Sequence, residues 1–140
     1  MNSILILIVL SFSLHSFSFS KVVKNPTALC NEEAVLYIDQ EYAAEICQNA
    51  KAGFQDCAQV TKNDINQAPV MSDNQLIRCA KALPGFKDCY PIASNSLDKE
   101  YSLDLCSSAK EGFKTCAVEE MKQVGYPILT DSQIQSCLGK

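Results

Sequence analysis

Two stretches of the chain decide the fold: YIDQEYAAEICQNAKAGFQDCA at residues 37–58 and SLDKEYSLDLCSSAKEGFKTCA at residues 96–117. They align at an offset of 59 and match at ten of 22 positions, including the cysteines, the glycine and the phenylalanine. A second pair, PVMSDNQLIRC at 69–79 and PILTDSQIQSC at 127–137, aligns at an offset of 58. The chain therefore contains two tandem four-cysteine repeat units, about 30–79 and 89–137.

The first twenty residues, MNSILILIVLSFSLHSFSFS, have the composition of a secretory signal peptide. Ser18 and Ser20 are small residues two apart, as signal peptidase requires, so cleavage is expected after Ser20. The apolar core is shorter than the ~20 residues that a membrane-spanning helix needs. We expect a signal peptide at 1–20, a single helical domain at 21–140, no membrane span after cleavage, and secretion to the extracellular space.

Eight cysteines follow the expected cleavage site. They are Cys30, Cys47, Cys57, Cys79, Cys89, Cys106, Cys116 and Cys137. An even number of cysteines in a secreted chain predicts disulfides. Metal binding is a weak alternative, because the sequence has no CxxC pair and its one histidine, His15, lies in the expected signal peptide. We expect four disulfides, no metal and no cofactor.

The first stretch of each unit has helical periodicity. Tyr42, Ile46, Ala50, Gly53 and Cys57 follow one another at spacings of four, four, three and four, which places them on one helix face. Residues 96–117 repeat the pattern. The sequence therefore predicts a long helix in each unit. Asn31 is a candidate N-cap from which residues 31–36 would extend the first of these helices.

The motif Gly-Phe-x-x-Cys occurs three times, at Gly53, Gly85 and Gly112. The glycine either ends a helix or lets a neighbouring helix approach closely. Pro84 precedes the middle copy and ends a helix there, because proline cannot continue one. The outer copies lack proline, which favours a continuous or kinked helix through Gly53 and Gly112.

The last helix of each unit has a clear start. Ser72-x-x-Gln75 and Thr130-x-x-Gln133 are capping boxes, in which the side chains at the two ends of the motif satisfy free backbone N–H groups. In each helix the residue before the N-cap and the fourth helical residue are both apolar, and the contact between them forms a hydrophobic staple. The pairs are Met71 with Leu76 and Leu129 with Ile134. The predicted fold is all-α: a disulfide-stapled helical bundle built from the two tandem repeats.

The disulfide pairing is open at this point. On an unbroken helix Cys47 and Cys57 would lie ~15 Å apart along the axis, whereas bonded cysteines have Cα atoms within ~7 Å. Each would then bond to a different element. A turn at Gly53 would instead permit a local Cys47–Cys57 bridge. We favour pairs that join the long helix to the short helix of each unit, Cys57–Cys79 and Cys116–Cys137.

Three Cys-x9-Cys frames, at 47–57, 79–89 and 106–116, resemble the twin motifs of the coiled-coil-helix-coiled-coil-helix family of the mitochondrial intermembrane space. In that family two antiparallel helices are joined by two disulfides. The resemblance covers the cysteine spacing alone. It implies antiparallel helices clamped by disulfides and implies no function.

Several function classes are set aside. The expected mature chain has no histidine, which removes the commonest general base and the usual catalytic triads. The twelve basic residues are scattered along the sequence and include a single arginine, unlike a nucleic-acid binder. Asp39 with Glu41, and Asp98 with Glu100, are carboxylate pairs, but residues two apart on a helix do not face each other. We expect no enzyme.

The remaining expectation is a secreted binding protein that holds a small apolar ligand or an extracellular protein. The candidate contacts are aromatic residues that could equally fill the core: Tyr42, Phe54, Phe86, Tyr101 and Phe113. The alternative is an extracellular interaction protein, such as a protease inhibitor or a defence or venom-like factor. The Pro-containing loops 68–71 and 126–129 suggest the inhibitor.

Overall fold

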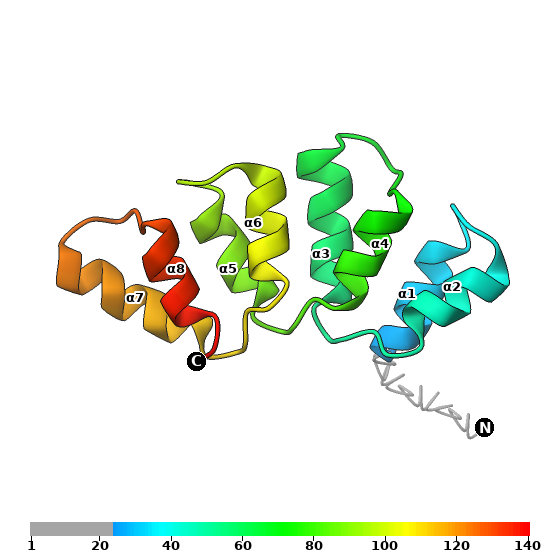
Figure 1. Cartoon of the computed structure of the whole chain (residues 1–140), viewed down its shortest axis with the longest axis horizontal. Coiled ribbons are helices and arrows are strands. Elements are labelled where there is room, and N and C mark those ends of the chain that lie inside the picture. Colours follow the sequence, from blue (N-terminus) through cyan, green and yellow to red (C-terminus); the bar gives the residue numbers. More distant parts are fainter. Residues whose placement is uncertain (1–23) are drawn as a thin grey trace, which may run out of the picture.

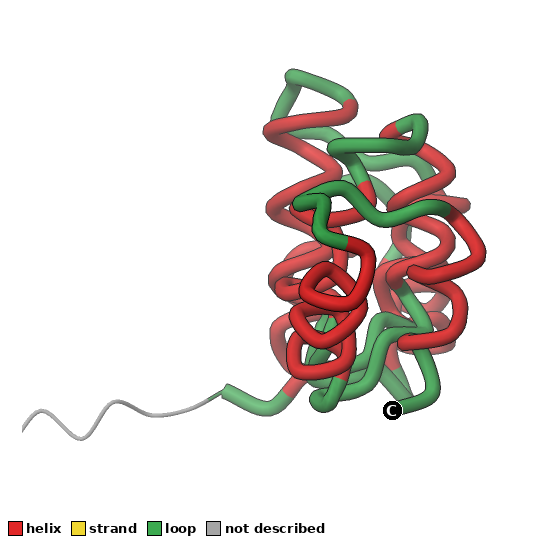
Figure 2. The backbone as a smooth tube through the Cα atoms, turned by 90° about the vertical axis from the view of Figure 1, so that its left-hand side faces the viewer, coloured by secondary structure: helices red, strands yellow, loops and turns green. Residues whose placement is uncertain are grey.

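The computed structural model describes residues 24–140, and the predicted signal peptide lies outside them. The described chain is all-helical, as predicted. Its helices are α1 (Pro26–Ala34), α2 (Gln40–Cys47), α3 (Phe54–Val60) with a π-helical turn η1 (Thr61–Ile65), α4 (Asp73–Ala80), α5 (Phe86–Ala93), α6 (Lys99–Cys106), α7 (Phe113–Val124) and α8 (Asp131–Cys137). They form four successive helical hairpins, which Figure 1 shows side by side in an arch. Odd-numbered and even-numbered helices make two layers (Figure 2).

One disulfide closes each hairpin. The pairs are Cys30–Cys47, Cys57–Cys79, Cys89–Cys106 and Cys116–Cys137. The two favoured pairs are confirmed, and the other two bonds were not predicted. Each Cys-x9-Cys frame connects one hairpin to the next, so the arrangement differs from the resembled family, in which two disulfides join a single pair of helices.

The prediction of helices that continue through Gly53 and Gly112 is wrong. α2 ends at Cys47, and α3 begins only at Phe54. Between them the backbone turns and pairs with a later part of the chain: Lys51 N–H donates to the Ala80 carbonyl and Gly53 N–H to the Ala82 carbonyl, both at 2.9 Å. This pairing replaces the hydrogen bonds that a continuous helix would have made.

The same pairing recurs along the molecule. We call residues 48–53, 81–85, 107–112 and 138–140 the linkers. Each of the first three linkers donates backbone N–H groups to carbonyls within the following linker or just before it. The further bonds are Leu83 N–H to Ser107, Gly85 N–H to Ala109 and Lys110 N–H to Leu138, at 2.9, 3.0 and 3.1 Å. The linkers therefore form a continuous ladder along the edge opposite the hairpin tips (Figure 1).

The glycines make this ladder sterically feasible. A Cβ atom on Gly53 would lie 2.6 Å from the Ala82 carbonyl oxygen, and one on Gly85 would lie 2.6 Å from the Ala109 oxygen. Real Cβ atoms do not approach backbone that closely. Hydrogen-bonded backbones sit ~4.8 Å apart, whereas packed helices need ~8–10 Å. The hairpins must therefore fan outwards from the ladder, as Figure 1 shows.

The start of the first helix also differs from expectation. α1 begins at Pro26, and the side chain of Asn25 caps it by accepting the Ala28 N–H at 2.7 Å. Asn31 lies inside α1 and caps nothing. Proline at the first position of a helix is favourable, because that position has no hydrogen bond to lose.

The predicted starts of α4 and α8 are confirmed. Both capping boxes are complete, with Ser72 and Gln75 at α4 and Thr130 and Gln133 at α8. The four staple residues are buried in the core. Disulfides, aromatic rings and alanines make up most of the remaining core, and Phe86 and Phe113 are fully buried at the starts of α5 and α7.

The π-helical turn explains why the repeat offset changes from 59 to 58. The first unit has one more residue between Ala58 and Pro69 than the second has between Ala117 and Pro127. The extra residue is absorbed in η1, where Asn66 N–H donates to the Thr61 carbonyl at 2.8 Å. In the second unit α7 runs as a regular helix to Val124.

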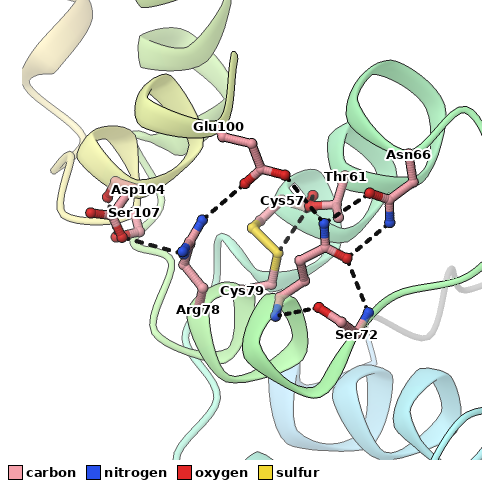
Figure 3. Close-up of a disulfide and its surroundings, with 10 residues drawn as sticks. Cys57, Thr61, Asn66, Ser72, Arg78, Cys79, Glu100, Asp104 and Ser107 are labelled. Carbon is pink, nitrogen blue, oxygen red and sulfur yellow. Dashed lines mark hydrogen bonds and ion pairs between the residues drawn. A yellow bond between two sulfur atoms is a disulfide. The ribbon is translucent and has the colours of Figure 1, made fainter. Parts of the chain in front are cut away.

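Charged side chains join α4 to α6 beside the Cys57–Cys79 disulfide (Figure 3). The Arg78 guanidinium lies 3.2 Å from Glu100 and 3.3 Å from Asp104. This fixes the junction between the two repeat units. None of the helices within residues 24–140 is long and apolar enough to cross a bilayer.

Candidate functional site

A groove with an apolar floor lies between α2 and α4. It encloses about 380 Å³. Tyr42 and Ile46 line it from α2, and Ile77 and Ala80 line it from α4. Its remaining lining residues are polar: Glu45, Gln48, Asn49 and Lys81. The groove is open to solvent, so an occupant would stay partly exposed.

The local sequence sets the position of each wall. Asp39 caps α2 by accepting the Tyr42 N–H at 3.0 Å, which fixes the first turn of that helix. Ile46 follows Tyr42 by four residues and therefore shares its face. On the other wall, the Cys57–Cys79 disulfide holds α4, and Ile77 lies two residues before the bonded Cys79.

In the second repeat unit the corresponding tyrosine is bonded to side chains of α8. Tyr101 occupies the position of Tyr42, and its hydroxyl donates to the Asp131 carboxylate at 3.0 Å. The Gln135 side-chain amide donates to the same hydroxyl at 3.3 Å. The bond to Asp131, together with slight burial, raises the pKa of Tyr101.

The two units share one of these partners and differ at the other. Asp73 aligns with Asp131, but Ile77 stands where the second unit has Gln135, and isoleucine has no group to bond to the tyrosine. Within the described residues, the Tyr42 hydroxyl has no hydrogen-bond partner from another side chain. The groove in the first unit thus combines an apolar floor with a hydroxyl that can donate to a bound molecule.

The five aromatic candidates from the sequence are divided between groove and core. Tyr42 lines the groove, and Tyr101 bonds to Asp131 in the second unit. The three phenylalanines, Phe54, Phe86 and Phe113, are at most 2% exposed. Sequence reasoning missed Ile46, Ile77 and Lys81. The signal that could have found Ile77 is its mismatch with Gln135 in the alignment of the two units.

The other hollows among the described residues are also open grooves or surface depressions. One of about 370 Å³ lies between α1 and α3, and one of about 290 Å³ lies between α3 and α5. Phe54 contributes to the first of these, which is otherwise mostly polar, with Gln55 and Gln59 among its lining residues.

The two Pro-containing loops bury one apolar residue and expose another. Met71 and Leu129 are 5% and 0% exposed, whereas Val70 and Ile128 are 53% and 57% exposed. In the second loop, the Ser96 hydroxyl donates to the Leu129 carbonyl at 2.8 Å. That bond anchors the loop next to its exposed side chains.

A partly buried ion pair elsewhere is a structural contact between the first two hairpins. Lys62 lies 2.8 Å from Glu33, and the Tyr37 hydroxyl donates to the same carboxylate. Burial raises the pKa of Glu33, but the bonds from Lys62 and Tyr37 outweigh it and hold that pKa below its usual value. Burial and Glu33 together raise the pKa of Tyr37 to about 12.

The described chain offers no reactive thiol, because all eight cysteines are in disulfides. Within residues 24–140, no group of three or more His, Cys, Asp or Glu side chains is placed to hold a metal ion. Asp39 and Asp98, the candidate carboxylates, serve as N-caps of α2 and α6.

Comparisons with protein-family models, with curated proteins and with solved structures find nothing that matches this chain.

Proposed function

We propose that the protein is secreted, is not an enzyme, and binds a partner protein in the groove between α2 and α4. The observation that carries the proposal is the contrast between the two repeat units. The same tyrosine is bonded to its own neighbours in the second unit and lines an open apolar groove in the first. The first unit therefore presents an unbonded tyrosine hydroxyl beside an apolar groove, and the second unit provides an internal control in which that hydroxyl is bonded.

The chemistry of the groove favours a protein segment over a small apolar ligand. Carriers of such ligands bury most of the ligand surface. Here the hollow is open, its edge is lined by amide and charged side chains, and the phenylalanines fill the core instead of a cavity. A peptide supplies both an apolar side chain for the floor and backbone groups for Gln48 and Asn49.

Charge indicates which peptides fit. α2 contains no basic residue, and its two glutamates, Glu41 and Glu45, are exposed and form no ion pair within the described residues. The preferred partner segment therefore has an aliphatic or aromatic anchor for Tyr42, Ile46 and Ile77, next to a lysine or arginine that faces Glu45.

Secretion is supported by the predicted signal peptide and the four disulfides, since disulfides persist in oxidising compartments. The absence of histidine from residues 21–140 and of free thiols supports a non-enzymatic role.

A displayed library of random peptides, selected on the immobilised protein, tests the proposal. We expect enriched peptides that share an apolar anchor beside a basic residue. The variant Ile77→Gln places an amide in the apolar floor, where the second unit has Gln135, and it should weaken binding of the selected peptides at least about tenfold, or about 1.4 kcal/mol.

The matched control is Gln135→Ile, which alters the second unit and should leave the binding of these peptides unchanged. Selection that yields no enriched peptide, or peptides that bind Ile77→Gln as tightly as the unmodified protein, would overturn the proposal. Circular dichroism of both variants checks that the helices are intact.

A second candidate, a protease inhibitor, is favoured by the loop at residues 126–129. Tyr126 is 73% exposed, and Ile128 is exposed beside the anchored Leu129 carbonyl. An exposed side chain on a held loop suits insertion into a protease cleft. A panel of extracellular proteases with fluorogenic substrates tests it: inhibition that Tyr126→Ala abolishes would support this function, and an unchanged rate for every protease would reject it.

A further inference from the structure

The linkers carry a concentration of positive charge that the sequence alone does not show. Each contains one exposed lysine: Lys51, Lys81, Lys110 and Lys140. The only acidic residue in the four linkers is Glu111, so together they carry a net charge of +3. Since the whole chain carries −4, the rest of it carries −7.

The ladder brings these lysines onto one edge. Linkers 48–53, 81–85, 107–112 and 138–140 are bonded in succession through their backbones or through residues directly beside them, so residues about 90 positions apart line a single ridge. Two contacts confirm the closeness of neighbours. Lys81 lines the same hollow as Asn49 of the previous linker, and Lys110 Nζ donates to the Gly139 carbonyl at 3.3 Å.

The charges of these lysines are also free to interact with a bound anion. None of the four forms an ion pair within the described residues, whereas most basic side chains of the helices do, including Lys62, Arg78 and Lys99. Lys110 bonds only to a neutral carbonyl and keeps its charge uncompensated. The ridge is therefore a basic stripe on an otherwise acidic protein.

We propose that this linker stripe binds a linear polyanion, specifically a sulfated polysaccharide of the extracellular space. The choice of a sulfated polysaccharide rests on the extracellular location proposed above. The stripe follows the inner edge of the arch, opposite the hairpin tips (Figure 1), and its charges are spread along a line as those of a polyanion are. The acidic remainder repels polyanions, so the stripe also fixes the orientation of the bound chain.

Binding to a size-selected heparin oligosaccharide, measured by titration calorimetry at several salt concentrations, tests the proposal. Each lysine that neutralises a polymer charge releases about 0.7–0.9 counterion, so four lysines give a log–log slope of about −3. Raising the salt from about 50 to about 150 mM should then weaken binding about 27-fold.

Two variants of equal net charge separate the stripe from the overall charge. Lys51→Gln with Lys110→Gln removes half the stripe, and we expect a slope smaller by about 1.5 and weaker binding at low salt. Lys99→Gln with Lys122→Gln removes two exposed lysines near the hairpin tips and should leave the slope unchanged. Neither pair lines the α2–α4 groove, so peptide binding there is expected to persist in both.

Three results would overturn the proposal. The first is no heparin binding at low salt, and the second is an equal loss of binding in both double variants. The third is binding to vesicles of anionic phospholipid or to single-stranded DNA that is as tight as binding to heparin, which would reject the sulfated polysaccharide as the ligand.

Discussion

Replacing Gly85 with alanine tests the linker ladder at the centre of the molecule. The added Cβ would lie 2.6 Å from the Ala109 carbonyl oxygen, which is backbone and cannot rotate away. The linkers must separate, and the bonds from Leu83 to Ser107 and from Gly85 to Ala109 are lost. Two such bonds contribute about 2 kcal/mol. Repacking around the extra methyl costs about 1–3 kcal/mol.

Alanine also restricts the unfolded chain, which offsets about 0.4–1 kcal/mol of this loss. The expected net decrease in the free energy of unfolding is therefore about 3 kcal/mol. Urea denaturation of the oxidised protein, followed by circular dichroism, measures it. Gly139→Ala is the matched control, because its Cβ would meet nothing within 4 Å, and it should change stability by less than about 0.5 kcal/mol. Equal stabilities of the two variants would refute the steric argument.

Three further predictions concern the hairpin contacts. Glu33 and Asp64 have lowered pKa values in the folded protein, so their stabilising contribution is present above about pH 4 and is lost as the pH falls through the folded pKa. Acid titration of the free energy of unfolding should show this loss, and the loss should be smaller in Glu33→Gln. Tyr37 has its pKa raised to about 12, so its contribution is complete below about pH 10 and is lost as the pH rises towards 12, as tyrosinate absorbance combined with circular dichroism would detect. Phe86→Ala should cost about 3–5 kcal/mol in urea denaturation, because the ring is fully buried, whereas the same change at the exposed Tyr126 should cost little.

Local signals in the sequence predicted local structure correctly. The capping boxes at Ser72 and Thr130 specify the starts of α4 and α8 through side chains three residues away. The bond between Cys57 and Cys79 was favoured over a local Cys47–Cys57 bridge, and the structure confirms it although the long helix assumed for it is broken.

The breaks at Gly53 and Gly112 were out of reach of that reasoning. Helical periodicity continues across Gly53, and the groups that end the helix there, the Ala80 and Ala82 carbonyls, lie about thirty residues later in the chain. The periodicity of one helix carries no information about hydrogen-bond acceptors that lie far along the chain. The three Gly-Phe-x-x-Cys motifs were in fact three copies of one junction.

The groove, like the helix breaks, could not be predicted from the sequence alone. Tyr42 was singled out from the sequence, but so was Tyr101, because the two look equivalent. Only the structure shows that Asp131 and Gln135 bond the Tyr101 hydroxyl, whereas the Tyr42 hydroxyl bonds no side chain within the described residues although Asp73 aligns with Asp131.

Pro26 lies four residues before Cys30, the place that Gly53 occupies before Cys57. Because proline has no backbone N–H, Pro26 cannot make the bond that Gly53 makes to the following linker.

The most direct test of the four-hairpin architecture is a disulfide map of the unreduced protein after trypsin digestion. Lys51, Lys81 and Lys110 lie in the linkers, so cleavage there separates the hairpins from one another. The account predicts that every disulfide-linked fragment in the mass spectrum contains the two cysteines of one hairpin, with Cys30 bonded to Cys47 and so on along the chain. A fragment that joins cysteines of two hairpins, such as Cys47 with Cys57, would contradict it.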